Sequence, residues 1–117
     1  MSGGTRRRRA NAVIREIVAE AVRTGLSDPR LASVTITNVS ATPDLREATV
    51  GYTTLADEDR DAAGEGLRAA RGVLQGKIGE ALQARNTPQL RFVLDEHHER
   101  AEALTRLIDE LSPPEEA

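Results

Sequence analysis

Apolar residues recur every three or four positions in three stretches of the chain, which is the spacing of one face of an α-helix. The first stretch predicts a helix over about residues 8–24, ended by Gly25 and followed by the turn Asp28-Pro29. Its apolar face consists of Val13, Ile14, Ile17, Val18, Ala21 and Val22. The preceding residues 1–6 are predicted to form a flexible basic leader.

Two stretches that follow alternate between apolar and polar residues, as strands with one buried face do. Residues 31–40 predict a first strand and residues 47–53 a second, and the turn Thr42-Pro43-Asp44 between them indicates an antiparallel hairpin. The alternation fails at Asn38-Val39, which a β-bulge would explain. A third short strand is predicted further along the chain. Its buried side is formed by Leu90, Phe92 and Leu94.

The second helical stretch, over about residues 60–85, is crowded with glycine. Its apolar positions are Leu67, Ala70, Leu74, Ile78, Ala81 and Leu82. Its glycines are Gly64, Gly66, Gly72, Gly76 and Gly79. Each glycine inside a helix costs about 1 kcal/mol relative to alanine, so one straight helix is disfavoured. A bend or a close backbone approach is therefore predicted around Gly72, in the triplet Ala70-Arg71-Gly72, with two helices end to end.

The third helical stretch starts at His98 and stops at Pro113-Pro114. Its apolar face consists of Ala101, Leu104, Leu107, Ile108 and Leu111, and its outer side is acidic. The order of elements predicts an α+β fold of two layers, a small sheet covered by helices. We expect a single domain over residues 7–111, followed by a disordered acidic tail at 112–117.

The sequence offers little material for catalysis. It contains no cysteine, which excludes disulfides, thiolate metal ligands and cysteine nucleophiles. His97 and His98 are adjacent, so they point in different directions and do not easily share a metal ion. No glycine-rich phosphate loop with its lysine occurs, and the acidic clusters lack the spacing of a calcium loop. We expect no catalytic residue, no cofactor or metal, and no small-molecule substrate. A hydrolase that uses His98 with Asp95 is a minor alternative.

No targeting or membrane-spanning segment is visible. The basic run of residues 6–9 precedes an apolar stretch, but Arg15, Glu16 and Glu20 interrupt what would have to be the core of a signal peptide. No stretch approaches the length needed to cross a membrane. We therefore expect a cytoplasmic protein without membrane contact.

The charges are distributed unevenly, although the net charge is only −3. Residues 1–30 contain seven arginines and three acids, whereas residues 95–117 contain two arginines and eight acids. This asymmetry indicates either a basic surface for a polyanion, with an acidic end directed away from it, or two differently solvated tails. Only two aromatic residues are present, so any RNA recognition has to rest on arginine, backbone amides and shape rather than on base stacking.

The region around Gly72 supports two interpretations. A helix that starts after a glycine can present free N–H groups to phosphate, and Arg71 and Lys77 lie near such a point. Alternatively, Gly72 only allows two helices to pack closely. The residues alone do not decide between RNA binding and packing.

Several motifs in a fixed order resemble the bacterial ribosome-binding factor A family over about residues 7–111. The motifs are Asp28-Pro29-Arg30-Leu31, Val34-Thr35-Ile36-Thr37, Pro43-Asp44-Leu45-Arg46, Ala70-Arg71-Gly72 and Arg85-Asn86-Thr87-Pro88-Gln89-Leu90-Arg91-Phe92. The resemblance implies a KH-like fold of type II order, in which an Ala-x-Gly kink between two helices replaces the Gly-x-x-Gly loop, with an additional C-terminal helix.

The resemblance also implies a function. Members of the family bind the small (30S) ribosomal subunit and its 16S rRNA, assist late maturation and rRNA processing, and are associated with growth in the cold. We accordingly expect a monomeric, non-catalytic assembly factor. This chain departs from the family in having almost no lysine and a short, acidic C-terminus, which puts in doubt any function attached to longer tails.

The candidate RNA-binding residues follow from the resemblance and from charge. By resemblance, Ala70, Arg71 and Gly72 would form a kink that faces RNA. The candidate phosphate contacts are Lys77, Arg30, Arg46, Arg85, Arg91, Arg8, Arg9 and Arg15. The expected binding surface is a basic face built from the first helix and the kinked pair. The alternative is a protein-interaction module whose helices pair in a dimer or a hetero-complex without RNA.

Overall fold

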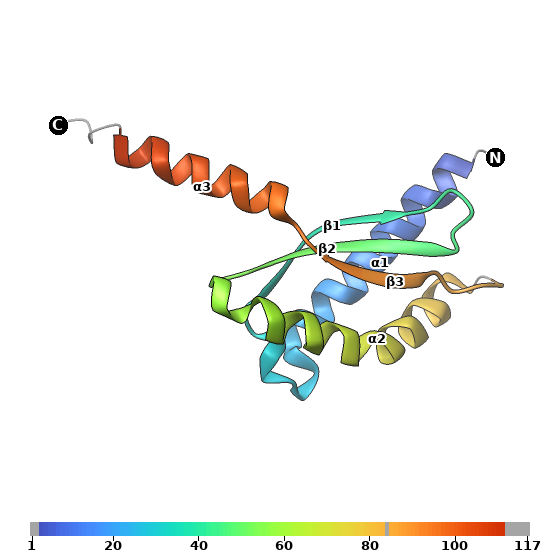
Figure 1. Ribbon diagram of the computed structural model, residues 1–117. Helices are drawn as coiled ribbons and strands as arrows, with labels where there is room; N and C mark the ends of the chain where they lie inside the picture. Colours follow the sequence, from blue (N-terminus) through green and yellow to red (C-terminus); the bar gives the residue numbers. More distant parts are fainter. Residues whose placement is uncertain (1–2, 84, 112–117) are drawn as a thin grey trace.

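The computed structural model describes residues 3–83 and 85–111, which form a three-stranded sheet and three α-helices (Figure 1). The main elements are α1 (Gly3–Thr24), β1 (Val34–Ala41), β2 (Glu47–Thr54), α2 (Arg60–Leu82), β3 (Gln89–Leu94) and α3 (Glu96–Leu111). Short 3-10 turns η1 (Gly25–Ser27) and η2 (Pro29–Leu31) join α1 to β1, and η3 (Asp57–Asp59) precedes α2. The predicted α+β class is confirmed.

The sheet has the order β1-β2-β3, with β2 in the centre. β1 and β2 form the predicted antiparallel hairpin, whereas β3 runs parallel to β2. The register of the hairpin shifts between Ile36 and Asn38, which confirms an irregularity where the alternation of the sequence fails.

Both α1 and α2 pack on one face of the sheet, and they also touch each other. The inward residues of the strands are buried, among them Val39, Val50 and Leu90. Polar residues that alternate with them, such as Thr35 and Thr49, are exposed. The core therefore lies between one face of the sheet and two helices, and the other face is open to solvent.

The first helix begins earlier than its apolar pattern indicated. α1 starts at Gly3 rather than near residue 8, so residues 3–6 of the predicted leader are helical. The first turns are held in place because Ala10 is buried and because Arg7 Nε donates to the carbonyl oxygen of Ala41 at 2.7 Å. Residues 1–2 of the leader and the predicted tail at 112–117 lie outside the described residues.

The predicted break in the second helical stretch takes a different form. α2 is a single helix through Ala70-Arg71-Gly72, and its ribbon changes direction along its length (Figure 1). A Cβ built on Gly72 would have no atom within 4 Å, so the protein's own backbone makes no close approach there. The helix ends at Leu82, before the predicted residue 85, because Gln83 adopts a left-handed conformation with φ 49°.

The apolar pattern identified most of the core correctly. Leu67, Leu74 and Ile78 are fully buried, but Ala81, which was predicted on the same stripe, is exposed. The sole phenylalanine, Phe92, is half-buried and packs against the core. The apolar positions of α2 therefore face the core up to Ile78, whereas in the last turn Ala81 is exposed.

The last helix, α3, projects from the body of the molecule (Figure 1). Its start is fixed by Asp95, whose backbone N–H donates to the carbonyl oxygen of Tyr52 at 2.7 Å. The Asp95 carboxylate also accepts a hydrogen bond from Thr37 Oγ1 at 2.5 Å. This bond passes over Gly51 of the central strand, where a Cβ would lie only 3.0 Å from Thr37 Oγ1.

Candidate nucleic-acid interface

Three segments that are distant in sequence meet at one end of the molecule. The first turns of α1, the turn between β1 and β2, and the end of α2 surround a small cavity of about 230 Å³. It is lined by Arg6, Arg9, Ala10, Leu45, Leu82 and Gln83. The start of β3 joins the same end, because the Gln89 N–H donates to the carbonyl oxygen of Arg46 at 2.9 Å.

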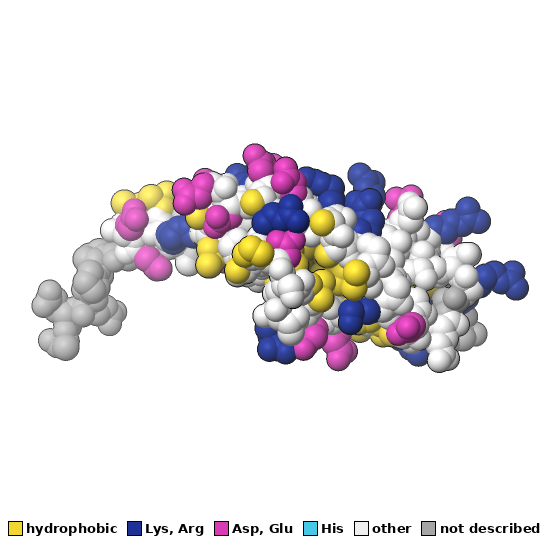
Figure 2. All heavy atoms as spheres, turned by 90° about the horizontal axis from the view of Figure 1, so that it is seen from below, with side chains coloured by type: hydrophobic (Ala, Val, Ile, Leu, Met, Phe, Trp, Pro, Cys, Tyr) yellow, Lys and Arg dark blue, Asp and Glu magenta, His cyan; other side chains and the backbone are white. Residues whose placement is uncertain are grey.

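We call this region the basic end. Its arginines are Arg6, Arg7, Arg8, Arg9, Arg46, Arg85 and Arg91. They outnumber the acids of the same segments, which are Asp44, Glu47 and Glu80. Figure 2 shows dark blue side chains at the end of the molecule opposite to α3. This arrangement concentrates positive charge on a part of the surface that a phosphate backbone could approach.

Most of these guanidinium groups are available to a ligand. Within residues 3–83 and 85–111, neither Arg8, Arg9, Arg85 nor Arg91 forms an ion pair, and all four are exposed. Arginine binds phosphate with two parallel donors, so unpaired arginines at one end of the molecule suit a polyanion. Arg91 pairs with Thr49 and lies on the open face of the sheet, whereas Arg8 and Arg9 lie on α1.

Arg46 is partly compensated by its neighbour. Its Nε lies 3.9 Å from Asp44 Oδ2. Asp44 is held by Thr42 Oγ1 and by the backbone N–H of Arg46, at 2.6 and 3.1 Å, and these hydrogen bonds lower its pKa. The carboxylate therefore stays charged and shapes the hairpin turn.

The middle of α2 presents a weaker positive charge. Arg71 and Gly72 are exposed, whereas Ala70 is half-buried against the core. Lys77 borders a groove of about 470 Å³ between α1 and α2, beside Glu16 and Glu20. These two carboxylates would repel phosphate from the groove, so the predicted basic face of α1 and α2 is interrupted by acids.

Arg30 is engaged in ion pairs within the protein. Its Nε and Nη2 lie 3.0 and 2.8 Å from the two carboxylate oxygens of Asp28, and Nη1 lies 3.8 Å from Glu65. The hydrogen bonds from Arg30 hold the pKa of Asp28 below its ordinary value. Asp28 also caps η2, with Pro29 in the first turn and Leu31 buried. This motif therefore builds the connection between α1 and β1.

Arg15 lies apart from the basic end. Its side chain is exposed on α1 and donates to the carbonyl oxygen of Thr37 at 3.3 Å. The predicted candidates thus divide into a group at the basic end (Arg8, Arg9, Arg46, Arg85 and Arg91) and the separate Arg15, Arg30, Arg71 and Lys77. Arg6 and Arg7 were not among the candidates, although the arginine run was the signal that could have included them.

Other kinds of site receive no support from the described part of the chain. No three His, Cys, Asp or Glu residues gather there in a way that could hold a metal ion. His97 is exposed, and the side chain of His98 lies outside what the structure describes. Among the described helices, none is long and apolar enough to cross a membrane.

The helix-covered sheet defines a KH-like α+β domain with a basic end. Residues 6–108 match the family model described as ribosome-binding factor A. The ribosome-binding factor A of Streptomyces coelicolor is 42% identical over 118 residues, which cover 99% of this chain and 74% of that protein. The chain belongs to the ribosome-binding factor A family.

Solved structures share this fold. The crystal structure of ribosome-binding factor A from Thermus thermophilus matches with a TM-score of 0.66 at 24% identity, over 75% of this chain and 93% of that one. A Thermus thermophilus model fitted into a cryo-EM map of a 30S complex matches with a TM-score of 0.58 at 25% identity, over 71% and 88%. The chain spans between 54% and 74% of the length of the curated relatives that it matches.

Proposed function

We propose that this protein binds the small ribosomal subunit through its basic end, by contacts between arginine side chains and 16S rRNA phosphates. The supporting observation is that the arginine run of α1, the hairpin turn next to Arg46 and the end of α2 meet at one end. Arg85 follows this end of α2, and Arg91 lies on β3, which starts there. Family membership supports the small subunit as the target, since a model of a related protein has been fitted into a cryo-EM map of a 30S complex.

Binding would assist late maturation of the subunit and the processing of its rRNA without a chemical step by the protein. Arginine contacts fix the position and shape of a local RNA segment, which favours one folded arrangement over others. One copy of the chain is sufficient for this role. The positive charge at one end and the acidic α3 at the other would orient the molecule as it approaches the polyanionic subunit.

The salt dependence of binding tests this function. If the protein neutralises about five phosphates, the logarithm of its affinity for purified small subunits should fall by ~4 for each tenfold rise in salt. Co-sedimentation over a series of salt concentrations measures this slope, and purified large subunits are the control. Binding that does not change with salt, or equal binding to both subunits, would contradict the proposed mode.

A further inference from the structure

The apolar face of α3 has no partner in the described structure. Its large side chains Leu104, Leu107, Ile108 and Leu111 are 58%, 50%, 52% and 73% exposed. With Ala101, they lie within about a third of the circumference of the helix, at 100° per residue. We call these five residues the α3 stripe. A contiguous apolar stripe of this kind marks a surface for binding rather than a solvated helix face.

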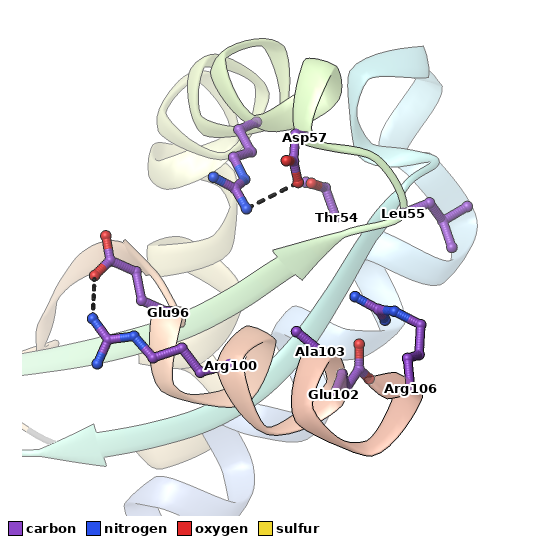
Figure 3. Close-up of a pocket in the computed structure, with 9 residues that line it drawn as sticks. Thr54, Leu55, Asp57, Glu96, Arg100, Glu102, Ala103 and Arg106 are labelled. Carbon is purple, nitrogen blue, oxygen red and sulfur yellow. Dashed lines mark ion pairs between the residues drawn. The ribbon is translucent and has the colours of Figure 1, made fainter. Parts of the chain in front are cut away.

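The stripe does not face the body of its own molecule. A cleft of about 410 Å³ separates α3 from the connection between β2 and α2 (Figure 3). α3 contributes Glu96, Arg100, Glu102, Ala103 and Arg106 to its lining. No stripe residue borders this cleft, and the Arg100–Glu96 ion pair at 3.6 Å lies on this side. The charged side of α3 therefore faces inward, and the stripe is turned away from the cleft.

The start of the helix is anchored, so the direction of the stripe is defined. The hydrogen bond from Thr37 to Asp95 ties the residue before α3 to β1, and the backbone of Asp95 is bonded to Tyr52 of β2. A surface that is already oriented loses less conformational entropy when it binds.

The charges of α3 indicate which kind of molecule binds the α3 stripe. The helix carries five acids and two arginines, and acids lie on both sides of the stripe. RNA would meet repulsion between carboxylates and phosphates, and a second copy of α3 would bring acids against acids. We propose that the α3 stripe docks on a basic, partly apolar surface of a protein in the small ribosomal subunit.

This proposal rests on the proposed function, because it takes the partner to be a component of the same subunit. The stripe and the basic end lie at opposite ends of the molecule (Figures 1 and 2). The basic end would then bind rRNA through charge, while the α3 stripe binds a protein surface through apolar contacts. The two contributions differ in their dependence on salt.

Photo-crosslinking from the stripe tests the proposal directly. The full chain carries p-benzoylphenylalanine in place of Leu107, and a control chain carries it in place of Arg106, which lines the inward cleft. Each is bound to purified small subunits and irradiated. We expect the probe at position 107 to crosslink to a Lys- and Arg-rich segment of one subunit protein, at least about fivefold more than the control. Crosslinks to rRNA or to a second copy of the chain, or none despite co-sedimentation, would overturn the proposal.

A second measurement separates this proposal from the proposed function. The double variant Leu104→Gln/Ile108→Gln should bind small subunits about tenfold more weakly with an unchanged salt slope, since buried apolar contacts are lost and phosphate contacts are kept. The matched control Ala103→Gln/Arg106→Lys changes two exposed residues that line the inward cleft and keeps the net charge, so it should bind as the unmodified chain does. Equal losses in both variants would count against the stripe. If the chain does not co-sediment at all, the position-107 probe is mixed with proteins extracted from small subunits free of RNA. Crosslinking there supports docking without the proposed function, and no crosslinking refutes both.

Discussion

Gly66 and Gly72 lie on the same helix, but their surroundings differ. A Cβ on Gly66 would lie 3.0 Å from Arg30 Cβ and 3.2 Å from Leu31 Cδ2, because α2 passes close to η2. A Cβ on Gly72 would meet nothing within 4 Å. Packing inside this protein thus accounts for Gly66 and leaves Gly72 without an internal reason.

Alanine at these two positions should therefore have opposite effects. Gly72→Ala should raise the free energy of unfolding by about 0.5–1 kcal/mol, since alanine favours a helix and has room. Gly66→Ala should lower it, because overpacking costs about 1–3 kcal/mol and exceeds the helical gain. Urea denaturation measures both. A less stable Gly72→Ala variant would show that the helix needs glycine there for its own bend, whereas a stable variant with weaker subunit binding would assign Gly72 to RNA contact.

Arg71 and Lys77 provide a second test at the residue scale. Replacing both by glutamate should weaken subunit binding and leave the melting temperature nearly unchanged, because both side chains are exposed. The loss should be smaller than for arginines of the basic end, since Glu16 and Glu20 already oppose anions beside Lys77. Unchanged binding in this double variant would remove the middle of α2 from the interface.

Among the elements, η2 depends on ionised Asp28. Its carboxylate caps the turn and pairs with Arg30, and its pKa is lowered from 3.8. A carboxyl group with a lowered folded pKa contributes stability above its unfolded pKa and loses that contribution as the pH falls through the folded value.

Asp28→Asn should accordingly lower the melting temperature at pH 7, and the difference from the unmodified chain should shrink at a pH well below the ordinary pKa of 3.8. The effect should be modest because the pair is solvent-accessible. Thermal unfolding at both pH values measures it. Glu20→Gln is a control for the loss of a carboxylate elsewhere. The pKa of Glu20 is also lowered, by the hydrogen bond from Arg23, but Glu20 lies on α1, away from this turn. A difference that persists at low pH would mean that the charge of Asp28 is not what stabilises η2.

The periodicity of the sequence predicted the elements well but not what covers them. The apolar faces of α1 and α3 look alike as patterns, yet Ile14 is fully buried and Leu111 is 73% exposed. Spacing shows which side of a helix is apolar, whereas burial depends on neighbours that only the tertiary structure supplies. For the same reason the parallel pairing of β3 with β2, and the hydrogen bond from Arg7 to Ala41 near the start of α1, were not predictable.

At the scale of the whole molecule, the fold redistributes the charge blocks of the sequence. The seven arginines of residues 1–30 do not form one surface, since Arg23 and Arg30 pair with Glu20 and Asp28 far from the run at residues 6–9. The fold instead brings the segments that carry Arg46, Arg85 and Arg91 to the same end of the molecule as that run. The sequence could therefore predict that a basic surface exists. Which arginines form that surface depends on how the chain folds.

The central claim is that the basic end binds the small subunit by contact with phosphate. The most direct measurement compares Arg8→Glu/Arg9→Glu with the control Arg23→Glu/Arg68→Glu in co-sedimentation with small subunits over a salt series. The control changes the net charge equally at two exposed arginines of α1 and α2 outside the basic end. Because each lost phosphate contact lowers the magnitude of the salt slope by about 1, the first variant should bind more weakly with a slope smaller by about 2. The control should keep the slope of the unmodified chain. Equal losses in the two variants would show that only net charge matters, and an unchanged slope in the first would contradict the account.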